Sequence, residues 1–412
     1  MKKHLSINLL EKSIKALLFL ILFSPTIFQG VKLVLILFII SLYLITPLNK
    51  VRVNKSVLIW LFLYLATNYF FLILGSTRNS HVFNMLGSVY LIWPFVYALV
   101  FIFPLSLEKV KINIFTFSSK VGIVLSLLTI YIYFSYKGIF PVISILDIFF
   151  PYNINSYGGY VSYFSPSITS FFFLIPITAI AIFNKNEKKN FLLNCFSLFC
   201  MILCALLIGR RALILSTVLI IFLYIIFKML QRELKITEFV KYLFLFTLIF
   251  LLSSYIIDSF NLNLRIFNLD LISQISDGER HIQFVDLVNS WKKNPILGVG
   301  YGVNSEHVIR SYLVPGTYEL SYVALLFQTG VIGFLIYIAL YLWLALKMMF
   351  LYIRKKEMEY LAVLLSYISI MIAHGSNPYI TSFDGAWIIF FMLALINRDA
   401  NNSNRNGEKY ED

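Results

Sequence analysis

Residues 191–230 read FLLNCFSLFCMILCALLI, then GRR, then ALILSTVLIIFLYIIFKML, so two apolar runs are separated by Gly209, Arg210 and Arg211 alone. Each run approaches the roughly 20 residues that a helix needs to cross the hydrocarbon core of a bilayer. Strands of membrane barrels alternate apolar and polar residues, and these runs do not alternate. The stretch therefore predicts two membrane-spanning helices joined by a tight turn.

The rest of the chain has the same character. Of its 412 residues, 59% are hydrophobic and 13% are charged, and the mean hydropathy is +0.82. That composition excludes a water-exposed globular fold. We expect an all-α, polytopic integral membrane protein in which one domain, residues 1–412, contains about 12 transmembrane helices. The expected spans lie near Ala16–Phe28, Val34–Leu48, Ser56–Leu74, Met85–Phe103, Val121–Phe134, Ile168–Phe183, Phe191–Ile208, Ala212–Leu230, Tyr242–Ile257, Gly330–Leu351, Tyr360–Ala373 and Ala386–Ile396.

The basic residues are unevenly distributed between alternate loops. A net charge of +14 would favour a nucleic-acid partner in a soluble protein. If the N-terminus is cytoplasmic, however, the loops on that side hold 24 of the 34 Lys and Arg residues, and the other side holds ten against nine acidic residues. This is the positive-inside bias of membrane proteins. It predicts cytoplasmic N- and C-termini and removes the reason to expect a nucleic acid.

Two segments on the non-cytoplasmic side are too long to be turns. The first loop, residues 135–166, is rich in tyrosine, which is typical of an interfacial aromatic belt but also of a sugar-stacking surface. The second loop, residues 258–329, joins the ninth and tenth spans, and loops of that length inside a membrane protein are usually functional. The polar C-terminal residues 397–412 are expected to form a disordered cytoplasmic tail.

The large loop is expected to contain one amphipathic helix. Ser276 and Glu279 have the spacing of a capping box, which places the start of the helix there. Asn294-Pro295 should end it near Lys293, because the residue before a proline avoids the α conformation.

Arg280 begins an otherwise apolar stripe on this helix, followed by Phe284, Leu287 and Trp291. A guanidinium group in that position must find an anion. It could pair with a neighbouring acid such as Asp277, or it could bind phosphate, whose geometry matches the guanidinium fork. Both readings remain open from the residues alone.

Further features of the loop have two interpretations. Glu319 precedes an apolar helix, where a partly desolvated carboxylate could act as a general base or simply be a helix-terminal charge. Residues 298–302 (GVGYG) are expected to form a turn that lets the backbone approach another segment closely. Gly330 and Gly333 have the spacing of close helix packing.

Arg210 and Arg211 lie on the side of the membrane where basic residues are rare. They could extend towards lipid phosphates, or they could serve a site. Cys195, Cys200 and Cys204 all lie in one apolar run and are expected to be packing residues. The acids of the large loop are scattered, so we expect no metal and no cofactor.

The order of these motifs resembles a known superfamily. The chain has a GRRAL turn, then a large loop with Glu279-Arg280, then residues 291–302 (WKKNPILGVGYG), then residues 319–322 (ELSY), seven further residues and a Gly-x-x-Gly. From about the sixth span onward this is similar to the O-antigen polymerases (Wzy-type) and O-antigen ligases (WaaL-type).

The resemblance implies a fold like that of the GT-C glycosyltransferases and a site at the outer face of the bacterial inner membrane. The donor would be a glycan on undecaprenyl pyrophosphate. The family's turn arginine corresponds to Arg210, with Arg211 beside it, and its loop arginine to Arg280. Ligases carry a histidine where this chain has Glu319. That difference favours a polymerase, in which Glu319, Arg280 and Arg210 would be catalytic. Further candidate substrate-binding residues are Arg211, Arg265, Tyr318, Tyr322 and His281.

Two rival functions remain at this stage. One is an O-antigen ligase that transfers the glycan to the lipid A core of lipopolysaccharide. The other is a polysaccharide flippase or transporter, since about twelve spans are common there too, although long outer loops are not. A polymerase would contact membrane lipids and could interact with a chain-length regulator and a flippase. Its product could be O-antigen, capsule or exopolysaccharide.

Overall fold

A computed structural model describes residues 2–45, 52–107, 110–144, 146, 152–157, 160–230, 236–259, 269–311, 314–382 and 384–405. Within these residues the protein is helical apart from one antiparallel hairpin, β1 (Asn153–Tyr157) and β2 (Tyr160–Phe164). The hairpin lies in the tyrosine-rich segment that was expected to be a loop. The predicted all-helical class is otherwise confirmed.

The helices follow one another with short connections. In the first half they are α1 (Lys2–Phe23), α2 (Gln29–Ile45), α3 (Lys55–Ser76), α4 (Val82–Gly87), η1 (Ser88–Ile92), α5 (Trp93–Tyr97), η2 (Ala98–Ile102), α6 (Phe103–Leu105), α7 (Ile114–Tyr136) and α9 (Ile168–Phe183). In the second half they are η3 (Lys185–Asn190), α10 (Phe191–Ile208), α11 (Arg211–Leu230), α12 (Ile236–Ser259), α13 (Leu269–Lys292), α14 (Ser321–Lys355), α15 (Met358–His374) and α16 (Trp387–Arg405).

Six helical stretches of the described chain are long and apolar enough to cross a membrane. They are Lys55–Ser76, Val82–Leu105, Ile114–Tyr136, Asn186–Ile208, Arg211–Met229 and Ser321–Lys355. Four shorter apolar helical stretches accompany them, at Gln29–Ile45, Ile168–Phe183, Phe246–Tyr255 and Met358–His374. These helices support a polytopic fold, and the total of about twelve spans stays a prediction.

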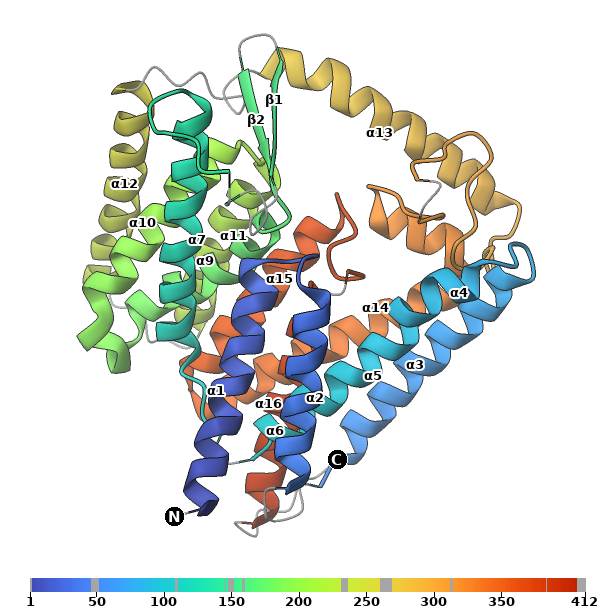
Figure 1. The fold of residues 1–412 in the computed structure, drawn as a ribbon, viewed down its shortest axis with the longest axis horizontal. Coiled ribbons are helices and arrows are strands. Elements are labelled where there is room, and N and C mark those ends of the chain that lie inside the picture. The colour runs from blue at the N-terminus through green and yellow to red at the C-terminus, as the bar shows by residue number, and fades with distance from the viewer. Residues whose placement is uncertain are drawn as a thin grey trace.

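The helices form two groups that meet along α15 (Figure 1). The almost fully buried α9 packs against α7, α10 and α15, and α14 packs against α3, α15 and α16. At one end of the molecule, α13 and the β1–β2 hairpin lie across the helix ends, while the start of α1 and the end of α16 lie at the opposite end. Both ends of the described chain therefore lie at the same end of the molecule, and their cytoplasmic position stays a prediction.

Loops that should share a side of the membrane contact one another. At the end that carries α13, the backbone N–H of Thr26 donates to Asp384 (2.6 Å) and Arg78 donates to Asn294 (3.2 Å). At the other end, the backbone N–H of Asn54 donates to the side chain of Asn397 (2.7 Å). This segregation agrees with the alternation of loops deduced from the charge bias.

The expectation of a disordered tail from residue 397 onward is wrong for residues 397–405, which continue α16. Their polar side chains are used for packing and pairing. Asn397 is buried and donates to Ser106 (2.8 Å), and Asp399 is buried and binds Arg354 (2.8 Å). Polar composition alone does not reveal such long-range partners.

The expected start of the loop helix at Ser276 is also wrong, because α13 begins at Leu269. Apolar residues before Ser276, among them Leu271, Ile272 and Ile275, continue the helical spacing upstream, so the Ser-x-x-Glu pattern lies inside the helix. The end of the helix at Lys292 agrees with the stop predicted from Asn294-Pro295.

A buried ion pair joins α2 to the α15–α16 loop. Lys32 is fully buried, and its ammonium donates to Asp384 (2.6 Å) and to the carbonyl of Ser24 (2.8 Å). Burial raises the pKa of the Asp384 carboxyl, and the Lys32 charge together with hydrogen bonds from Thr26 and Gln29 opposes that rise. The pair fixes the loop that follows α15 to the first turn of α2.

We predict that Asn289, exposed on α13, and Asn186, exposed in η3, face opposite sides of the membrane. In intact spheroplasts, a membrane-impermeant maleimide should label Asn289→Cys at once and Asn186→Cys after the membrane is opened. The unaltered protein is the control, because Cys200 and Cys204 are buried and Cys195 is half-buried in apolar α10. Labelling of Asn186→Cys but not Asn289→Cys in intact cells would contradict the topology.

Removing one partner of the buried pair should destabilise the protein. Asp384→Asn leaves the Lys32 ammonium buried beside a neutral group, which we expect to cost about 3 kcal/mol and to lower the melting temperature in detergent. The double variant Lys32→Met/Asp384→Asn buries no charge and should recover most of that loss. A double variant less stable than Asp384→Asn would contradict this account.

Candidate functional site

The Glu319 carboxylate lies between two guanidinium groups. Arg280, on α13, donates from Nε to one oxygen (3.0 Å), and Arg310, in the loop before α14, binds the other oxygen through Nη2 (2.9 Å). The relative solvent exposure of the side chain is 37% for Arg280, 31% for Glu319 and 37% for Arg310, so a ligand can reach all three. Of the two interpretations of Arg280, the structure thus shows pairing with an acid, Glu319; the side chain of Asp277 lies outside the described residues.

The backbone at Glu319 is held by α13 as well. Gln283, one turn after Arg280 and buried, accepts hydrogen bonds through Oε1 from the N–H groups of Glu319 and Leu320 (3.0 Å each). Because α14 begins two residues after Glu319, these N–H groups lie at a helix start and need acceptors. One face of α13 therefore positions both the carboxylate and the backbone of Glu319.

The same helix positions the loop that carries Arg310. Asp286 is buried, and its Oδ2 accepts hydrogen bonds from the backbone N–H groups of His307 (3.1 Å) and Val308 (2.8 Å). The hydroxyl of Tyr318 accepts from the N–H of Ser305 (2.6 Å) and contacts its Oγ (3.0 Å). These contacts hold the residues just before Arg310 against α13.

A break in α14 supports this arrangement. Gly330 has a φ of 61° and interrupts the helix, which leaves backbone groups on both sides without helical partners. The segment after α13 supplies them: Gly300 donates its N–H to the carbonyl of Gln328 (2.8 Å), and Val331 donates its N–H to the carbonyl of Pro295 (2.9 Å). Residues 295–301 are thereby threaded along the broken helix.

The predicted close turn at residues 298–302 and the predicted packing of the Gly-x-x-Gly are both found. Gly300 has a φ of 88°, and a Cβ there would overlap the backbone nitrogen of Gly75 at the end of α3. A Cβ at Gly333 would overlap the ring of Phe71 on the same helix. The helix α14 begins at Ser321, before the tenth expected span, and is interrupted at Gly330, where that span was predicted to start; Gly333 marks the close contact with α3.

Arg210 and the three charged residues described above all lie close enough to Tyr379, in the loop after α15, to act on its hydroxyl electrostatically. Burial raises the pKa of the Tyr379 phenol, and the charges of Arg210, Arg280 and Arg310 lower it while Glu319 raises it. All four charged groups thus act on a single hydroxyl. Arg210 follows the left-handed cap Gly209, and its carbonyl accepts the first hydrogen bonds of α11. We refer to Arg210, Arg280, Arg310 and Glu319 as the charged cluster.

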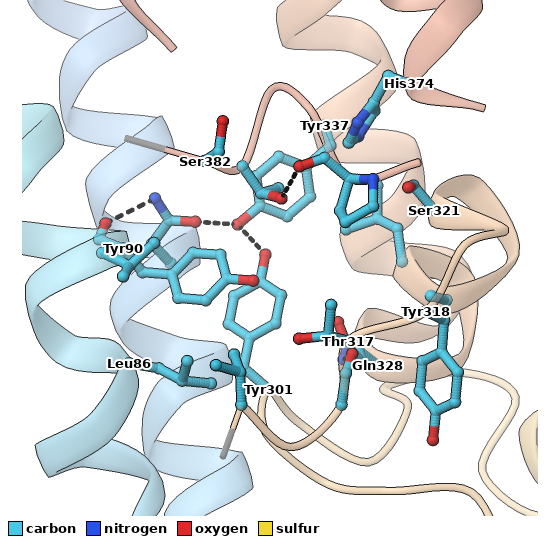
Figure 2. Close-up of a pocket in the computed structure, with 18 of the residues that line it drawn as sticks. Leu86, Tyr90, Tyr301, Thr317, Tyr318, Ser321, Gln328, Tyr337, His374 and Ser382 are labelled. Carbon is cyan, nitrogen blue, oxygen red and sulfur yellow. Dashed lines mark hydrogen bonds between the residues drawn. The ribbon is translucent and has the colours of Figure 1, made fainter. Parts of the chain in front are cut away.

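A cavity of about 290 Å³ lies beside the charged cluster, and Figure 2 shows its lining. It is bounded by α3, α4 and η1, by residues 314–318, by α14 and by the loop after α15. Its lining includes Tyr318 and Ser321, which flank Glu319, and Pro378, which precedes Tyr379. Two segments of the chain, residues 318–321 and residues 378–379, therefore connect the cavity wall to the charged cluster.

The other predicted binding residues differ from one another in burial and in hydrogen-bond partners. Tyr322 donates its hydroxyl to the carbonyl of Met371 (2.7 Å), which ties α14 to α15, and Tyr318 is buried with its hydroxyl on the Ser305 loop. Arg211 and His281 are exposed, and Arg265 lies outside the described residues. In the described part of the chain, no three His, Cys, Asp or Glu side chains gather as metal ligands do.

Comparison with known families identifies the region that contains most of this site. Residues 196–338, from α10 to the middle of α14, match the family Wzy_C, described as O-antigen ligase. The chain carries a Wzy_C domain. This domain is shared by Wzy polymerases and WaaL ligases, which transfer lipid-linked glycans. No curated protein matches the chain. Together, the apolar helices and the Wzy_C domain indicate a multi-pass membrane protein of a bacterial polysaccharide family.

Sequence reasoning missed several residues of the site. Arg310 and Tyr379 carry no recognisable motif, although Arg310 is one of the few basic residues predicted on the outer side. Gln283 and Asp286 follow Arg280 by three and six residues, so helical spacing could have placed them on the same side of α13. Arg310 and Tyr379 both lie in irregular loops, where spacing does not predict position.

Adding a methyl group at Gly300 should disturb the whole site. Gly300→Ala would push residues 298–302 away from α3 and strain a residue with positive φ, so we expect a loss of roughly 2 kcal/mol or more in stability. Gly278→Ala, on α13 with open space around its Cα, is the matched control and should leave the melting temperature unchanged or slightly raised. Equal melting temperatures for the two variants would contradict the tight packing of residues 298–302 against α3 and α14.

Proposed function

We propose that this protein polymerises lipid-linked oligosaccharide repeat units at the outer face of the bacterial inner membrane. The growing chain on undecaprenyl pyrophosphate is the donor, and a single lipid-linked repeat unit is the acceptor. The observation that carries the proposal is the charged cluster, in which Arg280 and Arg310 hold Glu319 at the end of a helical membrane bundle.

The charge balance of the cluster suits a diphosphate. Three guanidinium groups and one carboxylate leave an excess of positive charge, and guanidinium groups bind phosphate oxygens in a matching fork. Arg280 and Arg310 are both partly exposed, so the diphosphate can compete with Glu319 for them. Binding of the donor would thereby release the Glu319 carboxylate for another role.

The proposed reaction is a single displacement at the anomeric carbon of the donor. A hydroxyl oxygen of the acceptor sugar forms a bond to that carbon while the bond to the pyrophosphate oxygen breaks. Arg210, Arg280 and Arg310 stabilise the negative charge that develops on the departing undecaprenyl pyrophosphate. Glu319 accepts the proton of the attacking hydroxyl. The products are a chain longer by one repeat unit and free undecaprenyl pyrophosphate.

A polymerase fits the chain better than its rivals. The position of the ligase histidine is occupied by Glu319, which favours a polymerase over a ligase that acts on lipid A core. The Wzy_C domain favours glycan transfer over flipping or transport. Arg211, Arg265, His281, Tyr318 and Tyr322 remain proposed contributors to substrate binding. A chain-length regulator and a flippase remain proposed partners, with no cofactor or metal required.

Removing either cluster arginine should abolish chain extension. We expect Arg280→Ala and Arg310→Ala each to lower turnover by roughly 100-fold, since each removes a donor to the departing diphosphate. Surface glycan separated on a gel should then contain single repeat units in place of a ladder. Lys293→Ala is the matched control, because Lys293 pairs with Glu306 in the same loop, outside the cluster, and it should give a full ladder.

The membrane level of each variant must equal that of the unaltered protein. Full ladders from both arginine variants would end the proposed role of the cluster. Loss of all surface glycan, with lipid-linked polymer retained, would point to a ligase instead.

A further inference from the structure

The cavity beside the charged cluster has a lining unlike that of a lipid groove. Tyr64, Tyr90, Tyr301, Tyr337 and Tyr341 contribute to it. The ring of Tyr90 stacks on that of Tyr301 with centroids 4.1 Å apart. Such rings offer flat apolar faces with hydroxyl groups at one edge. A sugar ring has the same combination, so the two can stack and form hydrogen bonds.

Hydrogen bonds fix the floor of the cavity in advance. The hydroxyl of Tyr301 donates to that of Tyr337 (2.6 Å), which donates to the side chain of Asn68, and Asn68 donates to the carbonyl of Tyr90 (2.9 Å). Gln328 donates to the carbonyl of Gly316 (2.6 Å), which fixes the loop that forms another wall. A ligand would meet polar groups whose positions are already set.

The hydroxyl groups of Tyr90 and Thr317, both in the lining, are free to bond a ligand. Figure 2 shows the ring of Tyr90 reaching over Tyr301 towards the middle of the cavity, with Thr317 on the facing wall. Neither hydroxyl makes a hydrogen bond to any residue that the structure describes. An isoprenoid chain would cover both hydroxyls without bonding them, which is costly, whereas a sugar can bond both.

We infer that this cavity binds a sugar ring of the lipid-linked glycan, next to the diphosphate held by the charged cluster. The inference rests on the proposed function for the identity of the ligand. The cavity volume of about 290 Å³ lies at the lower end for small-molecule sites. It suits one or two sugar rings, not a whole repeat unit. The sugar that enters would contact Tyr318 and Ser321, which lie one and two residues from Glu319 in the chain.

The test is a binding measurement on the full chain in lipid nanodiscs with two probes. One probe is undecaprenyl pyrophosphate, and the other is the undecaprenyl-pyrophosphate-linked repeat unit extracted from the cells that make this protein. Tyr90→Phe removes one spare hydroxyl, and Thr317→Trp fills the cavity from a loop that is only partly buried. Tyr69→Phe, an exposed tyrosine on α3 outside the cavity, is the matched control.

We expect the affinity for the repeat-unit lipid to fall about fivefold in Tyr90→Phe, the value of one lost hydrogen bond. In Thr317→Trp it should fall to the affinity for undecaprenyl pyrophosphate. The affinity for undecaprenyl pyrophosphate itself should be the same in all variants, and Tyr69→Phe should match the unaltered protein with both probes.

Equal losses for both probes in Thr317→Trp would overturn the inference, because the cavity would then hold the isoprenoid or the diphosphate. Unchanged affinities in both cavity variants would overturn it as well. The proposed function fails separately: an unaltered protein that binds the repeat-unit lipid more tightly than undecaprenyl pyrophosphate, yet forms no polymer, would refute polymerisation and leave the sugar site standing.

Discussion

The pairing of one carboxylate with two guanidinium groups is the constraint on which the rest of the site depends. Arg280 comes from α13, Arg310 from the loop that follows, and Glu319 from the residue pair before α14, so the ion pairs close three segments around one point. Partly exposed pairs of this kind contribute little to stability by themselves. Their value here is positional, because Gln283 and Asp286 on α13 fix two parts of the loop that carries Arg310 and Glu319. The site is therefore assembled on a rigid helix, although most of its residues lie in irregular backbone.

The broken helix α14 explains how irregular backbone can be held so close to a membrane bundle. Its interruption at Gly330 leaves donors and acceptors that the segment 295–301 satisfies, and in return that segment is locked between α3 and α14. The same locking places Tyr301 against Tyr90 and Tyr337, which form the floor of the cavity. The glycines of this region thus serve both the packing of the bundle and the shape of the proposed sugar site.

Sequence patterns predicted the helical fold and the close turn at residues 298–302, and they singled out Arg280, Arg210 and Glu319 as candidates for the site. Apolar run length and charge bias are local properties, and they suffice for helices and their alternation. They could not predict Arg310, Tyr379 or the Lys32–Asp384 pair, because these contacts join segments far apart in the chain or lie in loops without a period. The helical end of α16 was missed for the same reason, since the partners of Asn397 and Asp399 lie far away in the chain, at Ser106 after α6 and at Arg354 near the end of α14.

The central claim is that a diphosphate replaces Glu319 as the partner of the two arginines. The most direct measurement is an electron cryo-microscopy structure of the full chain in nanodiscs with undecaprenyl pyrophosphate bound. We expect the phosphate oxygens within hydrogen-bonding distance of Arg280 and Arg310, with the Glu319 carboxylate turned away from at least one of them. A bound diphosphate at another place, with both ion pairs to Glu319 intact, would contradict the account.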